Sequence, residues 1–257
     1  MAVARHVPAD RAEAGARSLH QEVPSPRGRR REVVSRYAAA LFDLDGTLVD
    51  SAAGIVAAVR HALVAVGASE LPDDDDILME IGRPLEEIFR DLGSPGGPDV
   101  AFEFAREFRD FYADHFADGI RLYSGVREGL AALAANGVAM GVVTTKLEEQ
   151  AEMVVAAVGL RPFLRVVHGW KEGRQHKPSP EPVCAVIAAL GVDPSASLMV
   201  GDSELDVLAG RAAGAETCAV TYGFRPAAYL AGFRPDYIVS RFADVVPIIL
   251  GPGPPPA

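Results

Sequence analysis

Two aspartates near the start of the sequence have a spacing that suits chemistry at the end of a strand. The apolar run from Ala38 to Phe42 is typical of a buried strand, and Asp43 and Asp45 follow it directly. Side chains at positions i and i+2 of an extended chain lie on the same side, so both carboxylates emerge together. Because open α/β sheets bind ligands at the carboxyl ends of their strands, we expect these two acids to belong to a functional site.

Three later segments add polar residues that could join this pair. Thr144 and Thr145 end a second apolar run, and Asp202 ends another, with Asp206 four residues further on. Lys177 lies in a polar loop between those two segments. Hydroxyls, an ammonium group and several carboxylates around one edge suit phosphoryl transfer through an aspartyl nucleophile.

The elements that must position these residues alternate between strands and helices. After the first strand we expect strands over 138–146, within 163–169, and over 197–201, 216–221 and 236–240. Helical patterns occupy 125–136, 147–158, 180–190, the segment after Asp202 to 213, and 241–250. This alternation predicts an α/β fold with a Rossmann-like parallel sheet and right-handed crossovers.

A wholly helical block, residues 53–118, interrupts the alternation between the first two strands. We interpret it as an inserted lid, with the aromatic residues of 100–116, Phe102 included, in its interior. Arg83, between Gly82 and Pro84 in this block, could reach the far end of a substrate. A solvated loop arginine is the alternative for Arg83.

Composition excludes several classes of function. The formal net charge of −10 argues against nucleic-acid binding, and the sequence has neither an 18-residue apolar run nor a secretory signal. We therefore expect a cytoplasmic protein with no membrane partner.

The two cysteines, Cys184 and Cys218, are expected to be reduced core thiols. Residues 1–36 are expected to form a disordered arginine-containing tail, and 251–257 a loose tail rich in Pro and Gly.

The motifs in order resemble the haloacid dehalogenase superfamily of phosphohydrolases, over residues 38–245. The residues that carry the resemblance are Asp43-Leu-Asp45-Gly-Thr47, Thr144, Lys177, and Gly201-Asp202 with Asp206. Within the superfamily, three further strings look like the phosphoglycolate phosphatase group: Asp50-Ser51, 201–206 and Thr221-Tyr-Gly-Phe224. Bacterial pyrophosphatases of that group are similar too. The resemblance implies a core domain of 37–52 and 119–250, with 53–118 as a helical cap domain.

The resemblance also implies roles for the polar residues. Asp43 would attack phosphorus and form an aspartyl-phosphate, while Asp45 would protonate the leaving oxygen and then activate water. Lys177 would neutralise the nucleophile and the charge that develops on phosphate. Thr144, with Thr145 beside it, would bind phosphate oxygens.

A divalent cation is implied as well, because a carboxylate attacks an anion poorly unless charge is neutralised. Mg²⁺ fits, since it prefers hard oxygen ligands. Its expected ligands are the Asp43 carboxylate, the Asp45 backbone carbonyl and Asp202. Asp206, one helical turn beyond Asp202, would hold a further ligand position or a metal-bound water.

The leading hypothesis is thus a Mg²⁺-dependent phosphatase for a small phosphorylated metabolite such as phosphoglycolate. Dehalogenation is disfavoured because dehalogenases of this superfamily lack a second aspartate at the position of Asp45. Phosphonate hydrolysis in the superfamily needs a lysine of the cap to form a Schiff base, and residues 53–118 contain no lysine. A pyrophosphatase, a sugar-phosphate mutase and, more remotely, a non-catalytic binding protein stay open. The sequence leaves open the exact substrate, a monomeric or homodimeric state, and the roles of His168, His176 and Lys146.

Overall fold

A computed structural model of the chain describes residues 35–251. The two expected tails, 1–36 and 251–257, lie almost entirely outside these residues. Within the described part of the chain, no helix combines the length and the apolar character that crossing a membrane requires.

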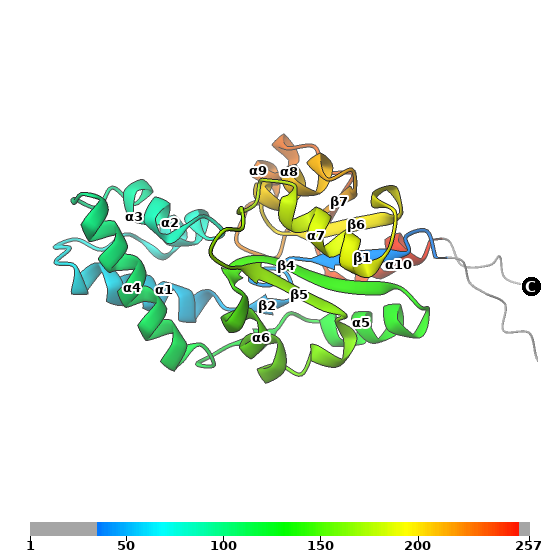
Figure 1. Cartoon of the computed structure of the whole chain (residues 1–257), viewed down its shortest axis with the longest axis horizontal. Coiled ribbons are helices and arrows are strands. Elements are labelled where there is room, and N and C mark those ends of the chain that lie inside the picture. The colour runs from blue at the N-terminus through cyan, green and yellow to red at the C-terminus, as the bar shows by residue number, and fades with distance from the viewer. Residues whose placement is uncertain (1–34, 252–257) are drawn as a thin grey trace, which may run out of the picture. The chain divides into compact units, whose positions relative to one another are not determined.

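Six parallel strands form one sheet within residues 35–251, in the order β5-β4-β1-β6-β7-β8 (Figure 1). The strands are β1 (Ala39–Phe42), β4 (Ala139–Leu147), β5 (Val166–Trp170), β6 (Ser197–Gly201), β7 (Glu216–Val220) and β8 (Tyr237–Val239). β1 lies in the middle, hydrogen-bonded to β4 on one side and to β6 on the other. The predicted α/β fold with a Rossmann-like parallel sheet is confirmed.

Helices cover both faces of this sheet (Figure 1). They are α5 (Val126–Ala135), α6 (Glu148–Ala157), α7 (Glu181–Leu190), α8 (Glu204–Ala212), α9 (Ala227–Gly232) and α10 (Val245–Leu250), with short 3₁₀ turns at Arg161–Phe163, Pro194–Ala196 and Phe242–Asp244. Alternate β1 residues point to opposite faces: Ala40 and Phe42 pack in a cluster with α5, α6 and α10, whereas Ala39 and Leu41 pack with α7 and α8. A strand buried on both faces is a rigid support for residues at its end.

Four further helices follow the first strand, and we call them the cap helices. They are α1 (Ala52–Ala65), α2 (Asp74–Glu80), α3 (Leu85–Asp91) and α4 (Pro98–His115). They share an apolar cluster of their own, in which Leu63, Phe89, Phe104 and Tyr112 are almost wholly buried. The expectation of a helical block after the first strand agrees with this arrangement.

A short antiparallel strand pair lies at the two connections of the cap helices, and the sequence pattern did not predict it. β2 (Val49–Asp50) pairs with β3 (Arg121–Leu122). The Arg121 guanidinium also donates to Asp50 Oδ2 at 2.7 Å. Two-residue strands are too short to show a period of two, so only the paired structure reveals them.

Two packing expectations were wrong. Phe102 is 62% exposed, because the buried stripe of α4 runs through Ala101, Phe104, Phe108 and Tyr112 and leaves Phe102 on another face. Cys184 is exposed on α7, whereas Cys218 is buried in β7 as expected.

Candidate active site

The register of the three central strands brings the predicted residues to one edge. Phe42 pairs with Val142 of β4 and Val200 of β6, so the residues that follow these positions emerge together. Asp43, Thr144 and Asp202 are all buried there. With Asp45, Thr145 and Lys177 among the other lining residues, they surround a small pocket of about 30 Å³.

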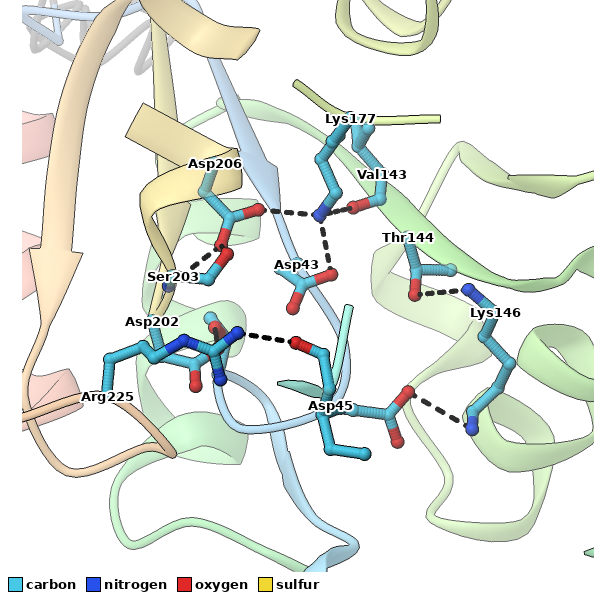
Figure 2. Close-up of polar contacts among 12 residues, drawn as sticks. Asp43, Asp45, Val143, Thr144, Lys146, Lys177, Asp202, Ser203, Asp206 and Arg225 are labelled. Atoms are coloured by element: carbon cyan, nitrogen blue, oxygen red, sulfur yellow. Dashed lines mark hydrogen bonds and ion pairs between the residues drawn. The ribbon is translucent and has the colours of Figure 1, made fainter. Parts of the chain in front are cut away.

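Lys177 lies at the centre of this edge. Its buried ammonium group donates to Asp43 Oδ1 at 2.8 Å, to Asp206 Oδ1 at 2.6 Å and to the Val143 carbonyl at 2.9 Å (Figure 2). Burial alone would lower the pKa of Lys177, but the carboxylates of Asp206 and Asp43 outweigh it and raise the pKa above its ordinary value. The side chain is therefore a fixed positive charge against Asp43.

Asp206 is tied to its own helix as well as to Lys177. Its Oδ2 accepts from the backbone N–H of Ser203 at 3.1 Å and from the Ser203 hydroxyl at 2.6 Å, which caps the start of α8. Gly201 permits this close packing, because a Cβ there would lie 2.1 Å from the Asp206 carboxyl carbon. Asp206 therefore serves to hold Lys177 in place, and Ser203 is a partner that the sequence reading missed.

Asp202 is held by the turn that follows Asp45. Thr47 Oγ1 donates to Asp202 Oδ1 at 3.0 Å, and the Phe224 N–H donates to Oδ2 at 2.7 Å. Gly46 makes the approach possible: its φ is +83°, and a Cβ there would lie 2.3 Å from Asp202 Oδ2. The segment from Asp43 to Thr47 therefore packs directly against Asp202.

The buried acids carry more negative charge than Lys177 balances. Burial raises the pKa of Asp43, and the neighbouring Asp206 and Asp202 add to this against the opposing charge of Lys177. Burial and then Asp206 likewise raise the pKa of Asp202, although hydrogen bonds from Phe224 and Thr47 oppose the shift. A cation placed between these carboxylates would remove the repulsion.

The arrangement of donors fits such a cation. Oxygens of Asp43, Asp202 and Asp206 lie within 4.8 Å of one another. Asp206 is engaged on both oxygens, one of them by the Lys177 ammonium group. Asp202 accepts from the neutral donors Thr47 and Phe224, and Asp43 accepts no hydrogen bond at Oδ2 within residues 35–251. Asp43 and Asp202 are therefore better placed than Asp206 to bind a cation. Hard oxygen donors of this kind suit Mg²⁺. The Asp45 backbone carbonyl stays a predicted ligand.

Asp45 lies beside Asp43 but has separate partners. Its Oδ1 accepts from the Ser51 hydroxyl at 2.6 Å, and its Oδ2 lies 3.2 Å from the buried Nζ of Lys146. That ammonium group is also 4.1 Å from the ring centre of Tyr112 in α4. Burial would lower the pKa of Lys146, but Asp45 and Tyr112 raise it above its ordinary value. The sequence left Lys146 open, and the structure places it against Asp45.

The two predicted phosphate-binding threonines differ in exposure. Thr144 is buried, and its hydroxyl accepts from the backbone N–H of Lys146 at 3.2 Å. Thr145 is half-buried and lines both the small pocket and a larger one beside it. Their role toward phosphate stays a prediction.

The larger pocket has a volume of about 190 Å³ and is lined by cap helices and by core residues. Arg83 lines it, but its guanidinium is paired with Asp91 at 2.9 Å and Glu80 at 3.0 Å. His176 also lines this pocket, whereas His168 lies on β5 and lines neither of the two pockets described here. The substrate contact predicted for Arg83 therefore competes with its ion pairs and stays a prediction.

A buried arginine that the sequence reading missed joins the core to the cap helices. Arg225 donates to the carbonyls of Leu78 at 2.6 Å and Ile81 at 2.8 Å, and to Glu204 at 3.2 Å. It directly follows Phe224, the residue that donates to Asp202. The loop after β7 thus contacts both Asp202 and the end of α2. Its sequence offers a charged residue but no sign of these partners.

Comparison with known proteins gives consistent matches. Residues 40–220 match the family described as haloacid dehalogenase-like hydrolase. The chain is 34% identical to the pyrophosphatase PpaX of Bacillus velezensis, over 83% of this chain and 96% of that protein. It is 35% identical to a phosphoglycolate phosphatase of Pectobacterium atrosepticum, over 81% and 90% of the two chains.

Solved structures agree. A crystal structure described as a predicted phosphoglycolate phosphatase from Haemophilus somnus aligns with a TM-score of 0.74 and 28% identity, covering 84% of this chain and 99% of that one. A haloacid dehalogenase-like hydrolase from Bacteroides fragilis aligns with a TM-score of 0.77 and the same 28% identity, covering 82% and 100%. The family match and the similarity to these relatives agree with the motifs at one sheet edge. The chain therefore belongs to the haloacid dehalogenase-like hydrolases, and within them to the phosphatases.

Proposed function

We propose that this phosphatase hydrolyses a small phosphorylated metabolite in a Mg²⁺-dependent reaction, through an aspartyl-phosphate on Asp43. The observation that carries the proposal is the contact between Lys177 and Asp43 at the wall of the small pocket. A small polar pocket that adjoins a larger one would provide places for a phosphoryl group and its leaving group.

Asp43 is prepared as a nucleophile by its surroundings. Lys177 holds Oδ1, while no hydrogen bond to Oδ2 is formed within residues 35–251, so Oδ2 is the oxygen proposed to attack. The charge of Lys177 offsets the repulsion between the carboxylate and the phosphate. Thr144, beside it, would then hold a phosphate oxygen.

Asp45 is proposed to move the protons. The Ser51 hydroxyl and the Lys146 ammonium fix its carboxyl group at the boundary of the two pockets. From there it would protonate the leaving oxygen and afterwards accept a proton from the water that attacks the aspartyl-phosphate. Ser51 and Lys146 would orient the group for both steps.

The bound Mg²⁺ would supply positive charge that neutralises the nucleophile and the phosphate during attack. We propose that Asp43 and Asp202 hold it, with Asp206 behind them and the Asp45 carbonyl as a further ligand. We also propose that residues 53–118 act as a cap domain over a core of 37–52 and 119–250, in a monomer or a homodimer.

Two substrate types follow from the names of the relatives. Phosphoglycolate is the candidate given by the relative from Pectobacterium atrosepticum, and pyrophosphate is the candidate given by relatives such as that of Bacillus velezensis. A mutase activity needs the same core residues and would differ in the exclusion of water.

The test is phosphate release from a panel of phosphorylated metabolites, pyrophosphate included, by the purified protein with Mg²⁺. We expect turnover that EDTA abolishes, and no turnover by Asp43→Asn, a nearly isosteric change that should leave the fold intact. Exposed Asp110 on α4 provides the matched control, Asp110→Asn, which should keep full activity. Turnover by Asp43→Asn at the wild-type rate would refute the aspartyl-phosphate route, and no release from any compound would favour a binding protein.

A further inference from the structure

The larger pocket differs in character from the small polar one. Six apolar side chains form much of its wall: Ile55, Ile81, Leu85, Ile88, Phe108 and Leu147. Its volume is about 190 Å³, against about 30 Å³ for the pocket that holds Asp43 and Lys177. The two pockets share Asp45, Ile81, Gly82 and Thr145, so the larger one adjoins the small polar one.

The wall also carries polar and charged side chains, His176 and Arg109 among them. His176 lies stacked on Trp170, with ring centres 5.2 Å apart, and its buried Nδ1 has no hydrogen-bond partner within the described residues. Arg109 of α4 also lines the pocket, and the charges of Arg109 and Glu86 both act on His176. These groups can receive a hydrogen-bonding or negatively charged end of a ligand.

Arg109 is the less engaged of the two arginines that line the pocket. Its contact with Glu86 is 3.5 Å, whereas Arg83 has pairs at 2.9 Å and 3.0 Å and lies 3.8 Å from Glu204 as well. A guanidinium with one long contact retains donors for a ligand. Arg109 is thus better placed than Arg83 to bind the distal end of a substrate.

Such a wall is a poor match for a small, highly charged leaving group. An inorganic phosphate released from pyrophosphate, or the two-carbon glycolate, would lose part of its hydration against these apolar side chains without gaining from their burial. A larger apolar body gains from the same burial. Resting on the phosphatase activity proposed above, we infer that the substrate is a phosphate monoester with a carbon-rich leaving group, whose acceptor or carboxylate end faces Arg109 and His176.

The first test compares substrates with leaving groups of similar acidity but different size, benzyl phosphate and methyl phosphate, alongside phosphoglycolate and pyrophosphate. We expect kcat/KM for benzyl phosphate to exceed that for methyl phosphate by about tenfold or more, and to exceed those of the two other compounds. Equal values for benzyl and methyl phosphate, or a preference for pyrophosphate or phosphoglycolate, would overturn the inference and leave the phosphatase function standing.

If no ester is hydrolysed, the proposed function fails separately, and the pocket is judged by binding. Calorimetric titration with benzylphosphonate and methylphosphonate gives that answer without turnover. Tighter binding of the benzyl compound, by about tenfold or more, supports an apolar leaving-group site. Equal affinities overturn it.

Variants locate the effect in the pocket. Leu85→Trp should fill it and bring the benzyl-to-methyl ratio of kcat/KM toward one, whereas Val64→Trp, at a 60% exposed position of α1, should preserve the ratio. Melting temperatures show whether each variant is folded. An unchanged ratio in a folded Leu85→Trp protein contradicts the inference.

The polar end is tested with 4-carboxybenzyl phosphate. Arg109→Gln should raise its KM by about tenfold while changing that of benzyl phosphate little, because a charge-assisted hydrogen bond is lost only with the carboxylate. The matched control is Arg106→Gln, which removes an exposed arginine of the same helix that pairs with Glu103 and Glu107. Equal effects of Arg109→Gln on both esters would refute the assignment of the polar end to Arg109.

Discussion

The Nζ atom of Lys146 lies 3.2 Å from Oδ2 of Asp45, and both side chains are nearly inaccessible to solvent. The same ammonium group contacts the ring of Tyr112 on α4. Because the Lys146 ammonium group contacts both Asp45 and α4, it couples the position of the Asp45 carboxyl group to the position of that helix. Lys146, near the end of β4, is therefore more than a surface lysine.

The first prediction concerns this pair. In Lys146→Met the carboxylate form of Asp45 loses its charged partner, so activation of water on the aspartyl-phosphate should slow more than its formation. We expect kcat to fall by about ten- to a hundredfold, with phosphoenzyme accumulating in acid-quenched samples. Lys171→Met, at a half-exposed lysine paired with Glu148, is the control and should behave as wild type. Wild-type kinetics in Lys146→Met would refute the role.

The second prediction concerns Asp45 itself. Asp45→Asn can still accept from Ser51 but can neither give up nor take a proton, so both proposed steps should slow, by about 10²- to 10⁴-fold. With p-nitrophenyl phosphate the leaving group needs little protonation, and phosphoenzyme should therefore build up. Trapping after acid quench measures it. An unchanged rate without trapped phosphoenzyme would count against the dual role.

The third prediction concerns the cation. Mg²⁺ bound by Asp43 and Asp202 should raise the melting temperature, with a stabilisation of about 2.7 kcal/mol at a free concentration about 100 times the Kd. Asp202→Asn should lose this effect while keeping the fold, because the amide oxygen can accept from the Phe224 N–H while the amide nitrogen donates to Thr47 Oγ1. Asp110→Asn serves as the control and should respond as wild type. A full Mg²⁺ shift in Asp202→Asn would place the ion elsewhere.

The fourth prediction concerns Arg225. Arg225→Ala removes the hydrogen bonds to Leu78 and Ile81 and leaves Glu204 buried with a weaker partner. We expect the free energy of unfolding in urea to fall by about 3–5 kcal/mol. Arg225→Lys should recover only part of the lost free energy of unfolding, since an ammonium group lacks the planar fork of donors that binds two carbonyls.

Arg211→Ala is the matched control for this change. Arg211 on α8 also donates to two backbone carbonyls, those of Phe233 and Arg234, but from an exposed position. Its removal should cost about 1 kcal/mol or less. Similar losses in Arg211→Ala and Arg225→Ala would mean that the contact with α2 adds nothing to stability.

The sequence by itself determined the strands of the parallel sheet, most of the helices, and the spacing of the acids at the ends of β1 and β6. The run Ala39–Phe42 is apolar at every position, which is typical of a central parallel strand. Because the chain is extended there, Asp43 and Asp45, two positions apart, lie on the same side. The spacing of Asp202 and Asp206 likewise follows from a strand that leads into a helix. These are local relationships, encoded by residues a few positions apart.

Tertiary structure alone decided which side chains meet across long separations. Lys146 against Asp45, Arg225 against Leu78 and Ile81, and the pairing of β2 with β3 join segments from about 70 to about 150 positions apart. Arg83, between α2 and α3, and Arg109, in α4, are both arginines of the segment 53–118. Arg83 is paired with Glu80 and Asp91, whereas Arg109 has one longer contact with Glu86 and retains donors. Periodicity reports the face on which a residue lies but not the partner it contacts, because partners are set by how the helices and the sheet pack in three dimensions.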